Sequence, residues 1–147
     1  MKKSLDQILD QWDIFATAHK QISTFVRKPI TENTAKGLVY PIMWADLQGQ
    51  AVAFQRAQIT ITIPVYFLDI IKRDYTNLGT VLSTELLVAD DFYTYFTDNE
   101  CEFGFYFSDS AAATSVIYDF DDLCAGYTMN IVIQIANSRN ETKIPMT

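Results

Sequence analysis

Few side chains in this sequence are of the types that perform acid–base or nucleophilic chemistry. His19 is the single histidine, and Cys101 and Cys124 are the two cysteines. Histidine is the commonest general base, but His19 falls on the apolar stripe of a predicted helix, where a hydrogen-bonded core residue is the simpler interpretation. Acidic residues flank both cysteines, and neighbouring carboxylates disfavour a thiolate nucleophile. We therefore expect no catalytic residue and no enzyme activity.

The densest group of possible metal ligands is the acidic run Asp119, Asp121 and Asp122. Hard cations bind carboxylate oxygens, so this run could hold one. Its spacing does not match the EF-hand loop, and the five glycines form neither a dinucleotide-binding fingerprint nor a phosphate-binding loop. A solvated turn is the favoured interpretation, and we expect no metal site and no cofactor.

Composition indicates a single folded domain over residues 1–147. Of these residues 49% are hydrophobic and 20% are charged, which is enough apolar content for a core and argues against disorder. The net charge of -7 disfavours ordinary binding to nucleic acid, because carboxylates repel phosphates. We recognise neither a secretory signal nor an apolar run of about 18 residues that could cross a membrane. Folding in a cytoplasm, with both cysteines as thiols, is expected.

The elements that must position these residues begin with a helix from Ser4, which Pro29 ends. Ser4 and Gln7 form a capping-box pattern, and apolar residues then recur every three or four positions as far as Val26. A polar loop over 31–37 leads to a strand over 38–47. Because Pro41 lies inside that strand and cannot donate to a ladder, we expect an edge strand or a bulge.

The segment 58–71, QITITIPVYFLDII, belongs to a long predicted strand over 55–71. Its first half alternates between Ile and polar residues, whereas its second half is apolar on both faces. Pro64 predicts a bend or bulge within it. A second helix over 77–96, capped by Asn77, and strands over 102–107, 115–120 and 127–136 follow, and residues 138–147 are expected to be a loose tail.

The order α-β-β-α-β-β, with a further β possible, predicts an α+β fold in which two helices cover one face of an antiparallel sheet. Since both faces of the second half of 58–71 are apolar, something besides the helices must cover its other face there. A neighbouring subunit is one candidate, since aromatic residues are enriched at buried interfaces.

Several stretches resemble a known family of phage proteins. Tyr40, Pro41 and Trp44 resemble the YP-x-x-W strand of tail-terminator or tail-completion proteins, and Phe67, Leu68 and Asp69 resemble the apolar end of their long strand. The element order is similar over residues 4–137. The stretch LCAGYTMNIVIQIANSRNE looks most like the neck proteins of crAss-like phages.

The resemblance implies a structural virion protein, assembled in the bacterial host cytoplasm. Such head–tail connectors form an oligomeric ring in the neck, contact adjacent neck and tail proteins, and let genomic DNA pass without sequence-specific binding. Membrane contact is not expected. The expected subunit or partner interface comprises Tyr40, Pro41, Trp44, Tyr66, Phe67, Leu68 and Ile70. The expected channel or loop contacts are Gly49, Gln50, Asp109, Asp119, Asp121 and Asp122.

Two alternatives stay open from the sequence. One is a small cytoplasmic α+β domain that binds a ligand or acts as an enzyme, whose aromatic residues would line a pocket. The other is a monomeric adaptor. The acidic charge has two interpretations as well: it could keep DNA from adhering to a channel, or it could serve solubility alone.

Overall fold

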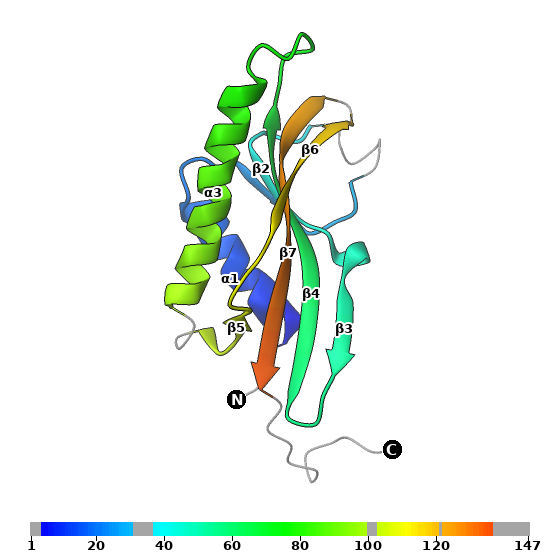
Figure 1. Ribbon diagram of the computed structural model, residues 1–147, viewed down its shortest axis with the longest axis vertical. Coiled ribbons are helices and arrows are strands. Elements are labelled where there is room, and N and C mark those ends of the chain that lie inside the picture. Colours follow the sequence, from blue (N-terminus) through cyan, green and yellow to red (C-terminus); the bar gives the residue numbers. More distant parts are fainter. Residues whose placement is uncertain (1–3, 31–36, 100–102, 121, 137–147) are drawn as a thin grey trace.

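The computed structural model of the chain describes residues 4–30, 37–99, 103–120 and 122–136. These residues form a mixed α+β fold with two helices and a seven-stranded sheet (Figure 1). The helices are α1 (Leu5–Ala18) and α3 (Leu78–Asp98). The strands are β1 (Thr24–Val26), β2 (Ile42–Ala45), β3 (Ala51–Phe54), β4 (Gln58–Ile70), β5 (Tyr106–Phe107), β6 (Ala113–Asp119) and β7 (Leu123–Ala136), and the 3-10 turn η1 (Leu47–Gly49) joins β2 to β3.

The antiparallel pair β4 and β7 forms the centre of the sheet. Their register runs without a break from Gln58 opposite Ala136 to Ile70 opposite Cys124. The strand order is β1-β2-β4-β7-β5, with β3 also pairing with β4, and β6 with β7. All of these pairs are antiparallel except β1 with β2, which is parallel. The α+β class is therefore confirmed, whereas the element order differs from the predicted one, since four strands precede α3.

The first helix begins as the sequence predicts but ends earlier. Both capping-box bonds are present: the Gln7 N–H donates to the Ser4 hydroxyl and the Gln7 side chain accepts from the Ser4 N–H. The predicted extension to Pro29 is wrong, because α1 ends at Ala18 and residues 24–26 form β1. Thr, Phe and Val in that segment favour a strand. The Ser23 N–H also donates to the Pro41 carbonyl at 2.8 Å, which draws the segment to β2.

Neither proline acts as the sequence predicts. Pro41 precedes β2, which lies between β1 and β4 and is not an edge strand. Pro64 lies within β4, but the pairing of β4 with β7 continues through it without a bulge. The interruption is on the other side of β4, where the partner changes from β2 to β3 across η1. The Pro64 carbonyl accepts the Asp46 N–H there at 2.9 Å. The N–H and C=O of one strand residue point to the same side, so the position where Pro64 lacks an N–H also faces this gap.

The helices cover only one face of the sheet, called here the helix face. Alternate β4 residues, including Ile63 and Phe67, point to this face and pack with Trp12 of α1 and Phe92 of α3. On β7 the helix-face residues include Ile131 and Ile133. Aromatic rings in this core pack edge to face: the ring centroids of Trp12 and Phe92, for example, are 5.2 Å apart.

The remaining elements differ from the prediction mainly at their ends. The predicted strand over 102–107 is reduced to β5, while β6 and β7 each begin earlier than expected. Asn77 stands at the N-terminus of α3 as predicted, but its side chain accepts the Lys72 N–H at 2.8 Å and does not cap the helix. Of the helices in the described part of the chain, none has the length and apolarity to cross a membrane. The expected tail over 138–147 lies outside the described residues.

Candidate assembly surface

An aromatic cluster covers part of the face opposite the helices. We call this the second-face cluster. Its buried members are Ile42, Trp44, Leu68 and Cys124, and its partly buried members are Val26, Ile30, Leu38, Tyr40, Tyr66, Val116, Tyr118 and Phe120. The cluster therefore joins β2, β4, β6 and β7 to the segment that precedes β2.

Ring geometry holds this cluster together. Trp44 stacks on Tyr66 at a centroid distance of 4.5 Å, and Tyr66 meets Tyr118 edge-on at 5.8 Å. Tyr118 in turn stacks on Phe120 at 5.2 Å. The indole N–H of Trp44 donates to the Lys28 carbonyl at 2.9 Å, so its polar atom is satisfied although the ring is buried.

Burial in the second-face cluster disfavours ionisation. It raises the pKa of the Tyr118 hydroxyl to about 12, with a further contribution from a hydrogen bond to Tyr66. It also raises the pKa of the Cys124 thiol to about 11, against the lowering effect of a hydrogen bond from Tyr40. A thiol with so high a pKa is protonated at neutral pH and is a poor nucleophile. Cys101 lies outside the described residues.

The predicted interface residues fall into three groups. Tyr40, Trp44 and Tyr66 meet in the second-face cluster, and Pro41, at the start of β2, is half-buried. Phe67 and Leu68 are fully buried within the single chain, on opposite faces of β4. Ile70, at the end of β4, is 44% exposed. The structure thus brings four of the seven, Tyr40, Trp44, Tyr66 and Leu68, into the second-face cluster.

The second half of β4 is apolar on both faces because the chain itself covers both of them. The helices cover Phe67 on one side, and residues of β6 and of the segment before β2 cover Leu68 on the other. A neighbouring subunit, which was one candidate for covering the second face there, is not needed to cover Leu68. Sequence periodicity showed that both faces are covered, but not which residues cover them.

The predicted channel residues are spread over the molecule. Gly49 and Gln50 lie at η1, where the Asp46 side chain accepts the N–H groups of Gln48 and Gly49. Asp109 precedes β6 and is exposed, whereas Asp119 is the last residue of β6 and Asp122 lies beyond that end. The Asp119 carboxylate is 3.5 Å from the Arg73 guanidinium. Asp121 lies outside the described residues.

His19 serves as a structural residue at the end of α1. Its Nδ1 accepts the Gln21 N–H at 3.1 Å, which assigns the ring proton to Nε2. Nε2 then donates to the Asp91 carboxylate of α3 at 2.9 Å. Because its ring also packs on Phe15 at 5.4 Å, His19 links the two helices.

Glu85 is the single fully buried polar side chain among the described residues. It is 1% exposed, and its Oε1 has no hydrogen-bond partner there. Burial, with the negative charge of Asp69 as a second cause, raises the pKa of Glu85 to about 8. Burial likewise raises the pKa of Asp69, against the lowering effect of its hydrogen bond from the Ile70 N–H. Glu85 is therefore largely protonated at neutral pH, which limits the cost of burying it.

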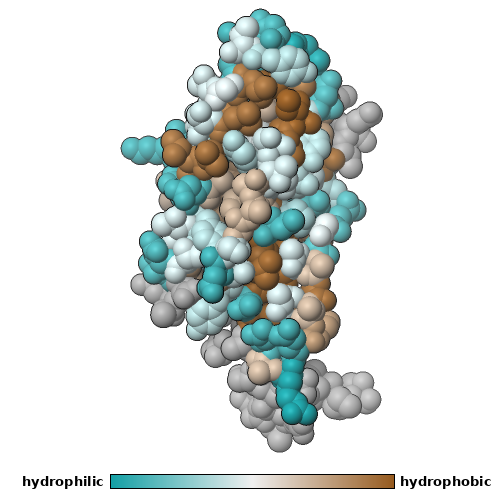
Figure 2. Space-filling model, in the orientation of Figure 1, coloured by the Kyte–Doolittle hydropathy of each residue, from teal (hydrophilic) through white to brown (hydrophobic). Residues whose placement is uncertain are grey.

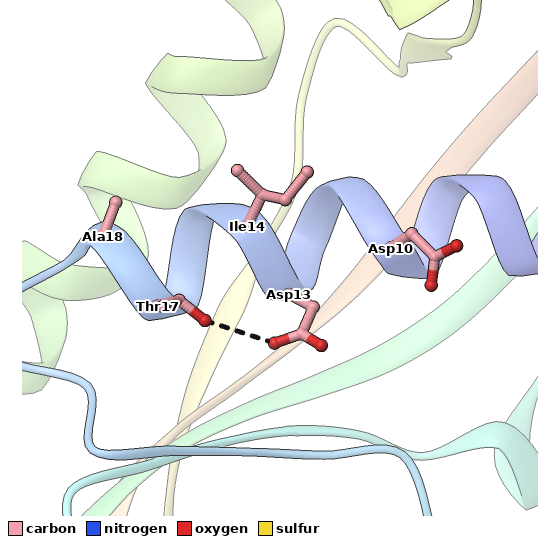
Figure 3. Close-up of a pocket in the computed structure, with 5 residues that line it drawn as sticks. All are labelled: Asp10, Asp13, Ile14, Thr17 and Ala18. Carbon is pink, nitrogen blue, oxygen red and sulfur yellow. Dashed lines mark hydrogen bonds between the residues drawn. The ribbon is translucent and has the colours of Figure 1, made fainter.

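A hollow of about 560 Å³ lies against α1 (Figure 3). Its described lining is Asp10, Asp13, Ile14, Thr17 and Ala18, all from one helix. The carboxylates do not converge on a common point: Asp13 accepts the Thr17 hydroxyl at 3.4 Å, and Asp10 is paired with Arg27 at 2.6 Å. Among the described residues this hollow therefore presents no arrangement that would orient a reacting group.

The most exposed large apolar residue on a described strand is Phe54 of β3, a strand that the sequence analysis missed. All four residues of β3 are exposed, and Phe54 is 80% and Val52 45% exposed. The stretch AVAF between Gly49-Gln50 and the turn at residues 55–57 was a usable signal for a short hairpin strand. β3 pairs with β4 alone in the described part of the sheet, so one of its edges is open.

A second apolar surface lies near the start of α3, where this helix packs on β7. Figure 2 shows apolar atoms gathered in the upper half of that view, over the region where Figure 1 places the start of α3 and the start of β7. The exposed large hydrophobic residues of α3 are Leu86, Leu87 and Tyr95, and β6, which pairs with β7, exposes Ile117. Leu82 is partly buried against Leu123 and Ala125 of β7.

No protein-family model, no curated protein and no solved structure matches the chain.

Proposed function

We propose that the chain is a structural virion protein that forms a homo-oligomeric ring at the head–tail junction of a phage. The proposal joins the sequence resemblance to tail-terminator proteins with one structural observation. That observation is the open edge of β3, which presents exposed Val52 and Phe54. An exposed apolar strand edge is a template for pairing with another chain, and natural proteins usually blunt such edges.

Charge supports the same proposal. The chain carries 18 acidic residues against 11 Lys and Arg, so a ring of several copies would multiply its negative charge. Such a ring would pass DNA without holding it, because phosphates are repelled. Asp109 precedes β6 and Asp119 is its last residue, so carboxylates lie near both ends of this edge strand.

The ligand-binding alternative has less support. The hollow beside α1 has its carboxylates engaged by Thr17 and Arg27 of the same chain. A ligand site usually offers a few convergent polar groups in a largely apolar pocket. The described lining offers no such convergence.

Two measurements test the proposed function. Native mass spectrometry and negative-stain microscopy of the full chain should reveal a closed ring of fixed subunit number at high protein concentration. In particles purified from the phage that encodes the chain, gold-labelled antibody against it should mark the junction between head and tail. Antibody that labels the capsid or the tail tip, or particles that contain none of this chain, would refute the assignment.

A further inference from the structure

The open edge of β3 can be assigned residue by residue. The Gln55 N–H donates to the Gln58 carbonyl of β4 at 2.9 Å. Backbone groups of successive strand residues point to opposite sides, so Ala51 and Ala53 also face β4. The N–H and C=O groups of Val52 and Phe54 therefore point away from the sheet. They are the groups that another strand could bind.

The side chains of these two residues lie on the helix face. Val52 is opposite Ile61 and Phe54 is opposite Ile59, and paired residues of antiparallel strands point to the same face. Ile61 belongs to the core beneath the helices. Val52 and Phe54 continue that apolar face beyond the part that the helices cover, which explains their exposure.

β6 offers a complementary edge on the other side of the sheet. The Ser108 N–H donates to the Val132 carbonyl at 2.9 Å, so the even-numbered residues of β7 face β5 and β6. Val116 is opposite Gly126 and therefore faces β7. The N–H and C=O groups of Ser115 and Ile117 then point outward.

The side chain of Ile117 also lies on the helix face. It is opposite Ala125, which packs in a cluster with Val81 and Leu82 of α3. Ile117 is 48% exposed. The open edge of β6 thus combines free backbone groups with an exposed apolar side chain on the helix face, as the open edge of β3 does with Val52 and Phe54.

We propose that β3 of one copy of the chain adds to β6 of a second copy, and that this pairing is the interface between copies. Three antiparallel steps lead from β3 through β4 and β7 to β6, so β3 and β6 run in opposite directions. Two copies placed side by side with continuous sheets therefore join as an antiparallel pair. Val52 lies opposite Ile117 and Phe54 opposite Ser115, all on the helix face.

The charges near the two edges favour the pairing of β3 with β6 over the pairing of β3 with β3 or of β6 with β6. Residues 47–68, which contain β3, hold Arg56 as their only charged residue. Residues 108–122, which contain β6, hold four aspartates and neither Lys nor Arg, and one of these aspartates, Asp119, is paired with Arg73. Pairing β3 with β3 would bring two arginines together, and pairing β6 with β6 would bring the aspartates together. The unlike pair is attractive and leaves one β3 and one β6 edge free, so copies add head to tail.

This inference rests on the self-association in the proposed function, but not on a virion or on a closed ring. If the chain forms closed rings in which β3 of one copy does not pair with β6 of the next, the inference is refuted and the proposed function is not. Open chains of copies joined through β3 and β6 would support the inference and count against the ring.

Disulfide cross-linking tests the register. In a Cys101→Ser background, the double variant Val52→Cys, Ile117→Cys places two cysteines on facing strands. Directly paired residues there have Cα atoms about 5.5 Å apart, which a disulfide can span. Mild oxidation of the concentrated protein should give a ladder of dimers, trimers and higher species on a non-reducing gel. The matched control pairs Ile14→Cys of α1, another exposed apolar position, with Ile117→Cys, and should give no ladder.

The single variants decide between symmetric and head-to-tail pairing. After oxidation, Val52→Cys alone and Ile117→Cys alone should each run as a monomer on the non-reducing gel. A strong dimer from either one would mean that like edges pair, and would overturn the proposal. The proposal would also be overturned if the oxidised double variant ran only as a monomer on that gel at the highest attainable protein concentration. That result would hold even if β3 bound a different partner protein.

A proline variant tests the backbone groups themselves. Val52→Pro removes an N–H that faces solvent in the single chain, so the fold should survive while association is lost. Circular dichroism reports the fold, and analytical ultracentrifugation reports association. Phe54→Ser, which removes an exposed side chain, is the second variant should Val52→Pro unfold. Wild-type association by a folded Val52→Pro, or by Phe54→Ser if the proline variant unfolds, would overturn the proposal.

Discussion

Trp44 and Tyr66 lie opposite each other on β2 and β4, and their rings stack at 4.5 Å with an interplanar angle of 24°. Both point to the face of the sheet that the helices leave uncovered. Their contact shows why the sheet is apolar on both sides at this level: a second cluster packs there against β6 and the segment before β2. The sheet is thus covered on both faces at one end and on a single face at the other.

Substitutions at Leu68 and Ile70 should separate folding from surface effects. Leu68→Asp places a carboxylate in the second-face cluster, where the side chain is fully buried, and should cost several kcal/mol or unfold the chain. Ile70→Asp, at an exposed position two residues later, should change stability by less than about 1 kcal/mol. Urea denaturation followed by Trp fluorescence measures both. Equal stability of the two variants would contradict the burial of Leu68.

Gly126 is predicted to tolerate no side chain. A Cβ there would lie 1.7 Å from the carbonyl oxygen of Phe67, which is backbone and cannot move aside without parting β4 from β7. Gly126→Ala should therefore destabilise the fold by roughly 3 kcal/mol or more, the larger end of single-substitution effects.

Gly79→Ala is the matched control for this glycine. Gly79 lies in the first turn of α3, and nothing lies within 4 Å of its added Cβ. Alanine has the higher helix propensity, so this variant should be neutral or stabilised by up to about 1 kcal/mol. Thermal unfolding of the two variants compares them directly. A Gly126→Ala protein as stable as wild type would mean that the close approach of β4 and β7 is not required.

The sequence predicted elements whose signals are local. The capping box of α1, the long strand β4 and most of α3 all carry their periodicity or capping residues within one segment. Residues 19–28 were misread because Ile22 and Val26 extend the helical spacing, while the pairing of β1 with β2 overrides it. β1 and β3 have three and four residues, too few for periodicity to identify either one.

The candidate surface was predictable only in part, for the same reason. Tyr40, Trp44 and Tyr66 were expected at an interface with another chain, and the structure places them in one cluster within the single chain. Their partners Tyr118 and Phe120 come from β6 and the turn after it, more than 50 positions from Tyr66, and no local pattern connects them. The open edges of β3 and β6 depend on strand order, which is a property of the whole sheet.

The capping box of α1 should contribute measurably to stability. Ser4→Ala removes the acceptor for the Gln7 N–H and should cost about 1 kcal/mol. Gln7→Ala removes the reciprocal bond, and the double variant should cost less than the sum of the two single changes, because the two bonds support each other. Chemical denaturation of the three variants gives the coupling energy. Strict additivity would show that the two bonds act independently.

Glu85 should make the stability of the fold fall as pH rises. Its pKa is raised from an ordinary 4.5 to about 8, so between these values the folded chain holds a proton that the unfolded chain has lost. More protons bound to the folded state mean that the free energy of unfolding decreases with increasing pH across this window. Above about pH 8 the cost of a buried charge should be fully present, on the order of a few kcal/mol.

Glu85→Gln isolates this effect, because glutamine has a similar shape and does not titrate. The variant and the wild type should have similar stability near pH 5, and the variant should be more stable by on the order of a few kcal/mol near pH 9. Asp69→Asn removes the negative charge that is the second cause of the shift, so it should weaken the pH dependence without abolishing it. Urea unfolding at a series of pH values measures all three proteins. If Glu85→Gln and the wild type show the same slope between pH 5 and pH 8, another group carries the pH dependence and Glu85 is not the buried acid that the structure describes.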